Sequence, residues 1–312
     1  MDFRQIEIFV KVAELGSFSR AAEALYLTQP TVSERVRSLE EELGQKLLDR
    51  QQRGATPTKA GQLLLTYARR ILQLQREARQ ALDEFQGRMS GELIVGASTI
   101  PGEYVLPPLI GRFKAKFPDI SISLLIGDTQ GVLDWLLDGK VEAGVVGARI
   151  DHRGLEYREL MPDELVLVVP AEHPWHGRKT VTLEEVRQEP LIVRERGSGS
   201  RHALERALGE VGLKLGAFKV VGEMGSTQAI KQAVKAGVGL SMISKRAVEE
   251  ECRANLLWCV KVKDLKFSRA FYLVIHRDRT RSPLAEAFRA FLLGEIRAVF
   301  PESERVSGVS QP

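Results

Sequence analysis

The sequence predicts an α/β protein in three parts: a small helical domain with a β-hairpin, one long helix, and a larger α/β domain with two lobes. Three observations predict this fold class. The first 57 residues contain three short helical patterns and a hairpin pattern. Residues 58–89 continue as one long helical pattern with a narrow apolar stripe. From Glu92 onward, short apolar runs alternate with helical segments, which is typical of parallel strands covered on both faces.

Domain boundaries follow from where these patterns change. The expected ranges are 1–60 for the N-terminal domain, 58–90 for the linker helix, 91–301 for the α/β domain and 302–312 for a disordered polar tail. Within the α/β domain we expect lobe I at about 91–161 and 268–301, and lobe II at about 162–267.

Length and composition are ordinary for a globular protein. The chain has 312 residues, of which 44% are hydrophobic and 28% are charged. No apolar run approaches the roughly 18 residues that a membrane helix needs, and the N-terminus lacks a basic and then apolar leader. We therefore expect a cytoplasmic protein without a membrane partner. The net charge of +4 is too small to indicate a nucleic-acid partner by itself, so that case depends on where the basic residues lie.

The sequence contains no pattern typical of catalysis or of a bound metal or cofactor. A Gly-x-Ser-x-Gly nucleophile elbow, a Walker loop and a His-Glu-x-x-His motif are all absent. The five histidines show no ligand spacing, and Cys252 and Cys259 form neither a zinc site nor a disulfide framework. We interpret the two cysteines as buried thiols, with a redox switch as the less favoured alternative. The chain is therefore not expected to be an enzyme.

Residues 16–44 predict a helix-turn-helix. Ser17 or Ser19 can cap a first helix, and a second helix can cross closely over its paired alanines, Ala21 and Ala22. After a turn at residues 26–28, Thr28 can cap the second helix, whose first turn tolerates Pro30. Four apolar residues at steps of four and three are expected to face the core, namely Val32, Val36, Leu39 and Leu43.

The opposite face of this second helix is polar, with Gln29, Ser33 and Arg37 spaced by four. A buried stripe combined with a polar N-terminal end suits insertion into the major groove of double-stranded DNA. The extended stretches around residues 53–54 predict a β-wing whose basic residues reach phosphates or the minor groove. The candidate DNA contacts are Ser19, Arg20, Thr28, Gln29, Pro30, Thr31, Ser33, Glu34, Arg35, Arg37, Arg50, Arg53 and Lys59.

The linker helix carries apolar residues at alternating steps of four and three, which is the spacing of a coiled-coil seam. This spacing predicts that two copies of the chain dimerise through these helices. The alternative is a helix that packs only on its own domain. The expected dimerisation residues are Leu64, Ala68, Ile71, Gln75, Ala78, Leu82 and Phe85.

The α/β domain is expected to contain eight strands and several covering helices. The candidate strands are Leu93–Ala97, Ile120–Ile126, Ala143–Val146, Leu165–Val169, Leu191–Val193, Phe218–Val221, Gly239–Ile243 and Phe271–Ile275. The candidate helices are Leu106–Phe117, Arg201–Val211, Thr227–Ala236 and Pro283–Phe300.

A binding cleft between two such lobes uses strand ends and helix starts, where unpaired N–H groups favour anions. The loop 194–201 combines small residues, hydroxyls and arginines, and we interpret it as a cradle for a small anion; a flexible turn is the alternative. At Ser226, capping of the next helix is at least as favoured as ligand contact. The candidate effector-binding residues are Ser98, Thr99, Ile100, Thr129, Gln130, Arg149, Arg196, Ser198, Gly199, Ser200 and Ser226.

The N-terminal stretch resembles the LysR-type transcriptional regulators, whose helix-turn-helix reads GSF..AA..L..TQP.VS..I..LE..LG..L..R and is followed by T..G. The residues that carry the match are Gly16, Ser17, Phe18, Ala21, Ala22, Leu25, Thr28, Gln29, Pro30, Ser33, Leu39, Glu40, Leu43, Gly44, Leu47, Arg50, Thr58 and Gly61. Two positions depart from the pattern. Leu48 stands where phenylalanine is usual. Glu34 stands where arginine or glutamine is frequent, and it either accepts from a cytosine amino group or pairs with Arg35 or Arg37.

The resemblance implies a two-lobed C-terminal domain with the fold of periplasmic binding proteins. It also implies a homodimer or homotetramer on an inverted-repeat DNA site, a small-molecule effector between the lobes, and a change in RNA polymerase recruitment. Ser98, Thr99 and Gln130 are then expected to line the effector pocket. An exported solute-binding protein would not need residues 1–90, and a purely architectural DNA-binding protein would not need the two-lobed domain.

Overall fold

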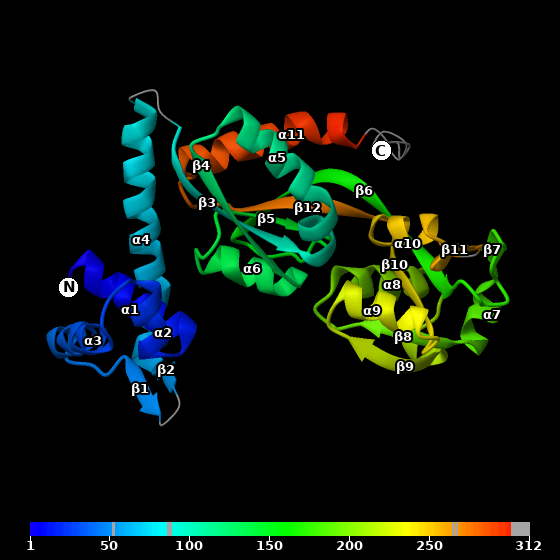
Figure 1. Ribbon diagram of the computed structural model, residues 1–312, viewed down its shortest axis with the longest axis horizontal. Helices are drawn as coiled ribbons and strands as arrows, with labels where there is room; N and C mark the ends of the chain where they lie inside the picture. The colour runs from blue at the N-terminus through cyan, green and yellow to red at the C-terminus, as the bar shows by residue number, and fades with distance from the viewer. Residues whose placement is uncertain (52–53, 86–88, 264, 266–267, 301–312) are drawn as a thin grey trace. The chain divides into compact units, whose positions relative to one another are not determined.

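The computed structural model describes residues 1–51, 54–85, 89–263, 265 and 268–300 (Figure 1). The chain divides into two compact units, one formed essentially by residues 1–88 and the other by nearly all residues from Met89 onward. Among the described residues, the structure contains no helix that is long and apolar enough to cross a membrane.

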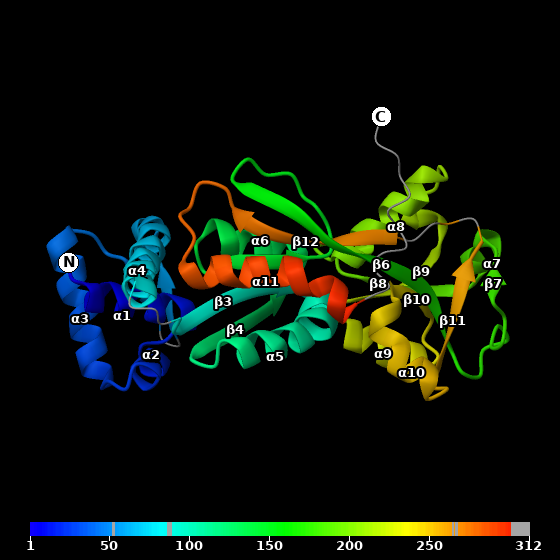
Figure 2. The ribbon, with the colours of Figure 1, turned by 90° about the horizontal axis from the view of Figure 1, so that it is seen from above.

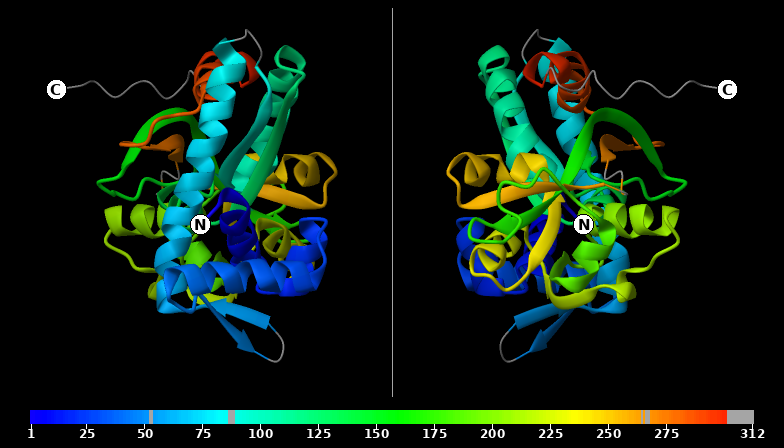
Figure 3. Two further views of the ribbon diagram at one scale, coloured as in Figure 1. Left: turned by 90° about the vertical axis from the view of Figure 1, so that its left-hand side faces the viewer. Right: turned by 90° about the vertical axis from the view of Figure 1, so that its right-hand side faces the viewer.

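The first unit is a helical bundle with a two-stranded hairpin, as expected from the patterns in residues 1–57. Figure 3 shows the antiparallel hairpin β1–β2 extending from the helices. The elements are α1 (Phe3–Leu15), α2 (Phe18–Ala24), α3 (Gln29–Leu43), β1 (Leu48–Gln51), β2 (Gly54–Pro57) and α4 (Lys59–Phe85).

Local capping sets the helix boundaries of the bundle. Ser17 rather than Ser19 caps α2, because its hydroxyl accepts from the amide of Arg20. Thr28 caps α3 in the same way, and α3 ends at Gly44, whose φ of 62° is left-handed.

The core of the first unit is formed by the buried stripes of its helices. Val32, Val36 and Leu39 of α3 are fully buried, as predicted. Leu43 is not, since it is 40% exposed. It is the last residue of α3, and the chain turns away at Gly44 before Leu43 can pack on the core.

The expected seam of α4 is partly wrong. Ala68 is completely buried in the core of its own unit, and Leu64 and Ile71 pack against the same core. Ala68 is therefore unavailable for a contact between copies, whereas Leu64 and Ile71 are only half-buried. The large exposed apolar side chains on the described part of α4 are Leu63, Tyr67, Leu74 and Leu82, and the small Ala78 and Ala81 are exposed as well. Ala78 and Leu82 belong to the expected seam. The side chain of Phe85 lies outside the part of the chain that the structure describes.

The second unit contains two sheets that share strand β6 (Leu155–Pro170). Lobe I has the order β4-β3-β5-β12-β6 and lobe II the order β6-β10-β8-β9, with β11 on the other edge of β6. The remaining strands are β3 (Gly91–Ser98), β4 (Ile120–Gly127), β5 (Ala143–Val146), β7 (Thr180–Val181), β8 (Pro190–Arg194), β9 (Lys219–Met224), β10 (Leu240–Ser244), β11 (Leu257–Val262) and β12 (Ser268–His276).

Four strands differ from the predictions. Residues 155–164 form the lobe I half of β6, where no strand was expected, because Glu and Arg interrupt the apolar alternation. Strands β7 and β11 were also missed; β7 has only two residues, and β11 lies between β7 and β6. Strand β9 begins one residue later than expected and runs on to Met224.

Helices cover both faces of each sheet. In lobe I, α5 and α11 pack on one face and α6 on the other, as Figure 1 shows from the side. Figure 2 shows α11 crossing in front of the strands of the sheet. In lobe II, α7 and α8 pack on one apolar cluster, and α9 and α10 on a second. The helical elements are the π-turn η1 (Pro101–Val105), α5 (Leu106–Lys116), α6 (Thr129–Leu137), α7 (Leu183–Gln188), α8 (Gly199–Glu210), η2 (Leu215–Ala217), α9 (Thr227–Lys235), η3 (Lys245–Val248), α10 (Glu249–Arg253) and α11 (Pro283–Val299).

Candidate functional site

The N-terminal end of α3 presents a polar surface. Thr28, Gln29 and Pro30 are exposed and Ser33 is half-buried, so these side chains can meet a partner without unfolding the bundle. Thr31, beside them, shares a short contact with the Thr28 hydroxyl, with 2.8 Å between the two Oγ1 atoms.

Two arginines of α3 are exposed and paired at its surface. Arg37 forms an ion pair with Glu41 at 3.2 Å, and Arg35 lies 3.8 Å from Asp2. One interpretation of Glu34 expected it to pair with Arg35 or Arg37, but both arginines pair with other carboxylates. The Glu34 side chain itself is exposed.

The other candidate DNA contacts lie around α3. Ser19 and Arg20 are exposed on α2, where the Arg20 guanidinium donates to the Leu15 carbonyl. Lys59 is exposed at the start of α4. Arg53 and the side chain of Arg50 lie outside the part of the chain that the structure describes.

Sequence reasoning missed Tyr26 in the turn between α2 and α3. Its side chain is 96% exposed, and its φ is 55°. A large aromatic residue is rarely held in this left-handed conformation. The helix-turn-helix pattern identified the turn but carried no information about which of its side chains projects into solvent.

Glu40 connects the end of α3 to the hairpin. Its buried carboxylate accepts from the amides of Leu47 and Leu48, at 2.9 and 3.2 Å, and from the Lys46 ammonium at 2.9 Å. Burial alone would raise the pKa of Glu40, but these hydrogen bonds outweigh burial and lower its pKa below the usual 4.5. The ionised carboxylate therefore holds β1 against the helix that carries the polar surface.

Glu40→Gln is expected to lower the free energy of unfolding of the first unit by about 2 kcal/mol at neutral pH, since it weakens hydrogen bonds to a buried charge. A lowered pKa means that the stabilisation is present above the unfolded pKa and is lost as the pH falls through the folded one. The difference between wild type and variant should therefore shrink in acid. Urea unfolding at pH 7 and pH 3.5 measures it, and an equal difference at both pH values contradicts the role.

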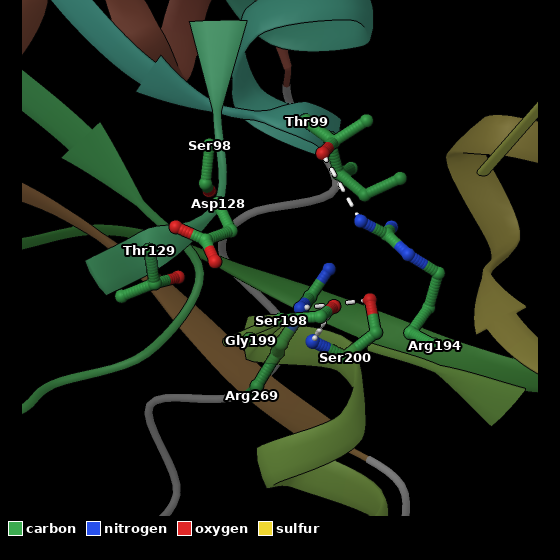
Figure 4. Close-up of a pocket in the computed structure, with 10 residues that line it drawn as sticks. Ser98, Thr99, Asp128, Thr129, Arg194, Ser198, Gly199, Ser200 and Arg269 are labelled. Atoms are coloured by element: carbon green, nitrogen blue, oxygen red, sulfur yellow. Dashed lines mark hydrogen bonds between the residues drawn. The ribbon is translucent and has the colours of Figure 1, made fainter. Parts of the chain in front are cut away.

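A small pocket lies between the lobes of the second unit, with a volume of about 210 Å³ that includes its open mouth (Figure 4). Lobe I contributes the end of β3, the start of α6 and one residue of β12. Lobe II contributes the end of β8 and the start of α8. The lining residues are Ser98, Thr99, Ile100, Asp128, Thr129, Arg194, Ser198, Gly199, Ser200 and Arg269.

Most of the predicted effector-binding residues come together in this pocket, and four do not line it. Gln130 donates to Asp134 on the outer face of α6, and exposed Arg149 pairs with Asp151. Arg196 is exposed. Ser226 caps α9 by accepting from the Ala229 amide at 3.1 Å, in agreement with the capping alternative.

Hydrogen bonds link the lining residues across the cleft. Thr99 of lobe I accepts from a terminal nitrogen of Arg194 of lobe II at 3.3 Å. Arg269 of lobe I donates to the Ser200 hydroxyl of lobe II at 3.2 Å. Both arginines are almost completely buried. The two lobes therefore meet through polar groups whose partners an effector can exchange.

The charge of each buried arginine is balanced by a neighbouring carboxylate. Arg194 is paired with Glu195 at 2.6 Å, and Arg269 with Asp163 at 2.9 Å. Asp163 also accepts from the Ser244 hydroxyl at 2.6 Å. These ion pairs fix the guanidinium groups in place, and each guanidinium has further donors beyond the ion pair.

Two buried polar atoms in the lining have no hydrogen-bond partner among the described residues: Oγ1 of Thr129 and Nη2 of Arg269. Buried polar groups in proteins almost always have a hydrogen-bond partner, so two buried polar atoms without one in the same pocket require an explanation. Both atoms belong to the same pocket, which also contains the N-terminal ends of α6 and α8. The unpaired N–H groups of a helix start add positive potential there.

The loops approach closely because two positions are glycine. A Cβ on Gly197 would lie 1.9 Å from Oδ2 of Asp128 across the cleft, and one on Gly199 would lie 3.0 Å from the backbone of Gly147. Asp128 caps α6 by accepting from the Gly131 amide at 2.7 Å. The two glycines therefore allow the loop at 194–201 to pack closely against lobe I. This role favours the cradle over the alternative of a flexible turn, which would need no such close contact.

Sequence reasoning did not single out Asp128, Arg194 or Arg269 as lining residues, although Arg194 belongs to the loop 194–201 that was interpreted as a cradle. Asp128 and Arg194 lie at the ends of strands, next to residues that were predicted as effector contacts. Their position at a strand end could therefore have identified them. Arg269 gave no local signal, because it comes from the start of β12, more than 60 residues from the other lining residues in the sequence.

Two family models match the chain and together span most of it. The model described as "Bacterial regulatory helix-turn-helix protein, lysR family" matches residues 3–62. The model described as "LysR substrate binding domain" matches residues 86–297.

Among the similar proteins is the "Probable RuBisCO transcriptional regulator" of Trichormus variabilis, 35% identical over 292 residues that cover 93% of this chain and 87% of the relative. A protein of the same description from Cyanidium caldarium is 34% identical over 293 residues, which cover 93% of this chain and 92% of the relative.

Solved structures share the fold. Full-length CbnR in complex with its target DNA matches with a TM-score of 0.70 and 24% identity, covering 94% of this chain and 99% of CbnR. The regulatory domain of Synechocystis CcmR in complex with 2-PG matches with a TM-score of 0.61 and 24% identity, covering 70% of this chain and 99% of that domain. At this level of identity, the likeness shows the fold alone.

Proposed function

Because this chain belongs to the LysR family of bacterial transcriptional regulators, we propose that it binds an inverted-repeat DNA site as a homo-oligomer and responds to a small anion bound between its C-terminal lobes. The family assignment confirms the predicted fold class, and it confirms the prediction of a regulator rather than an enzyme. The remaining statements concern the DNA contacts, the oligomer and the effector.

The observation that carries the effector proposal is the pair of unpartnered buried atoms in the pocket. A ligand oxygen can accept from Nη2 of Arg269 and from the amides that begin α6 and α8, while a ligand hydroxyl can donate to Oγ1 of Thr129. The small volume favours a ligand of few atoms. The complex of the CcmR regulatory domain with 2-PG supports a small molecule as the effector of this fold.

Ligand binding acts on the DNA only through a change of shape. An effector that closes the cleft shifts the oligomer between geometries only as far as it binds one of them more tightly. We propose that this shift alters the spacing of the two DNA-binding units and, through the DNA, the recruitment of RNA polymerase.

A thermal-shift screen of the full chain tests the effector proposal. The probes are small carboxylates and phosphate esters, each matched with its neutral amide or alcohol. At a concentration about one hundred times Kd, a ligand that binds only the folded state stabilises it by about 2.7 kcal/mol. We expect stabilisation by anions alone. Stabilisation by the neutral analogues, with none by the anions, contradicts the proposed charge of the effector.

The DNA contacts are tested at the N-terminal end of α3. Gln29→Ala and Ser33→Ala are each expected to weaken binding to the specific site roughly tenfold, the effect of losing one contact to a base edge. Binding to unrelated DNA, which depends on phosphate contacts, should change little.

Gel-shift titration at fixed salt measures both affinities. Ser38→Ala is a matched control, because Ser38 is exposed in the C-terminal half of the same helix and its hydroxyl accepts from the Gln5 side chain of its own unit. Specific affinities equal to that of the control reject the roles of Gln29 and Ser33.

A further inference from the structure

The two cysteines of the chain lie side by side in lobe II. Cys252 is in α10 and Cys259 is in β11, and their sulfur atoms are 2.6 Å apart. Both are free thiols and both are half-buried, so small molecules in solution can reach them. The seven-residue spacing in the sequence did not reveal this contact.

The fold itself brings the sulfur atoms together. Helix α10 ends in a tight turn in which Asn255 adopts a left-handed φ of 55° and the Leu256 amide donates to the carbonyl of Glu251. The chain then enters β11, where Cys259 is opposite Val168 of β6. The helix and the strand are each packed on the same apolar cluster, so neither sulfur depends on a loose loop for its position.

We propose that Cys252 and Cys259 form a reversible intramolecular disulfide when the protein meets a peroxide. In the first step, the Cys252 thiolate attacks one peroxide oxygen and the O–O bond breaks, which gives a sulfenic acid and releases water or an alcohol. In the second step, the sulfur of Cys259 attacks the sulfenic sulfur, the S–O bond breaks and a water molecule leaves. The two thiols lose two electrons and two protons in total, and the peroxide accepts them.

The environment distinguishes the roles of the two sulfurs. The hydrogen bond from Cys259 lowers the pKa of Cys252, which therefore forms the thiolate. The same hydrogen bond and burial raise the pKa of Cys259, which supplies the second sulfur. The neighbouring charged groups are Glu251 near Cys252, and Lys245 and Glu164 near Cys259.

The disulfide would form next to a contact between the lobes. Glu251, the residue before Cys252, forms a 2.7 Å ion pair with the buried Lys231 of α9. Lys231 in turn donates to the hydroxyl of Tyr104 in lobe I at 3.3 Å. Tying α10 to β11 thus restrains a carboxylate that orients the bridging lysine, so oxidation affects the same lobe-to-lobe movement as the proposed effector.

Peptide mapping of the full chain tests the proposal. Trypsin cleaves after Arg246, Arg253 and Lys261, so the two cysteines fall in separate peptides, Ala247–Arg253 and Ala254–Lys261. After treatment with hydrogen peroxide and alkylation of free thiols, we expect these peptides to be joined, with the mass of two hydrogen atoms lost. Dithiothreitol should then release both. Recovery of two alkylated peptides, or of peptides oxidised to sulfinic acid without a link, overturns the proposal.

Single serine variants test the order of the steps. Cys259→Ser should accumulate a sulfenic acid on Cys252, detected by a dimedone-type reagent, roughly tenfold faster than Cys252→Ser accumulates one on Cys259. Circular dichroism of both variants verifies that they fold. Equal rates in two folded variants would show that Cys252 is not the attacking thiol and would overturn the mechanism.

Discussion

Leu74→Glu is expected to prevent formation of the proposed dimer and to leave a monomer. Leu74 is 64% exposed near the middle of the 27-residue helix α4, and Leu63, Tyr67 and Ala81 are exposed on the same face. An apolar stripe of this kind on a long helix is covered most simply by the same stripe of a second copy. A glutamate there would place one carboxylate from each copy in an apolar contact.

The expected effect is large. An uncompensated buried charge costs about 3 kcal/mol or more. Each of the two copies would contribute one such charge to the contact, so the dissociation constant of the dimer should rise at least on the order of a thousandfold. Specific DNA binding should weaken with it, because only a dimer presents two recognition helices to an inverted repeat.

Light scattering over a range of concentrations measures the oligomeric state. Gln62→Glu is the control, because it adds the same charge to the same helix at an exposed position on a different face. Ala68→Glu is expected to unfold the first unit instead, since Ala68 is in its core. A Leu74→Glu variant that stays dimeric places the contact between copies elsewhere.

The helical pattern of α4 predicts an apolar face, but it does not determine which face is exposed. Helix α4 has two apolar faces, one that covers the bundle and one that is exposed, and a repeat of four and three fits both. The exposed side chains Leu63, Tyr67 and Leu74 each precede by one residue the predicted Leu64, Ala68 and Gln75. Only packing decides between the faces, and the sequence does not contain the position of the bundle against the helix.

The pocket was more predictable than the seam, for a physical reason. The carboxyl ends of parallel strands meet at one edge of a sheet. Ser98, which ends β3, and Ser198, which follows β8, therefore come together where the two lobes face each other. Arg269 obeys no such rule. Arg269 lies at the pocket because it pairs with Asp163 on β6, the strand that the two lobes share. These two residues are more than 100 positions apart, and no local sequence pattern predicts such long-range strand pairing.

Arg269→Lys is expected to weaken binding of an anionic effector by roughly ten- to a hundredfold, the effect of losing a hydrogen bond between charged groups. Lysine keeps a positive charge beside the buried Asp163 but cannot reach Asp163, Ser200 and a ligand at once, because it lacks the fork of the guanidinium group. Thermal shift gives the loss of affinity, and gel-shift titration without effector should show unchanged DNA binding.

Two further variants separate ligand contact from general damage to the domain. Arg149→Ala removes an exposed arginine of the same unit that is paired with Asp151, and should leave effector affinity unchanged. Thr129→Val removes a buried hydroxyl that has no partner among the described residues, so the ligand-free protein should be at least as stable while effector binding weakens. If Thr129→Val destabilises the ligand-free protein and binds the effector normally, the hydroxyl serves the fold and the pocket recognises its ligand by other groups.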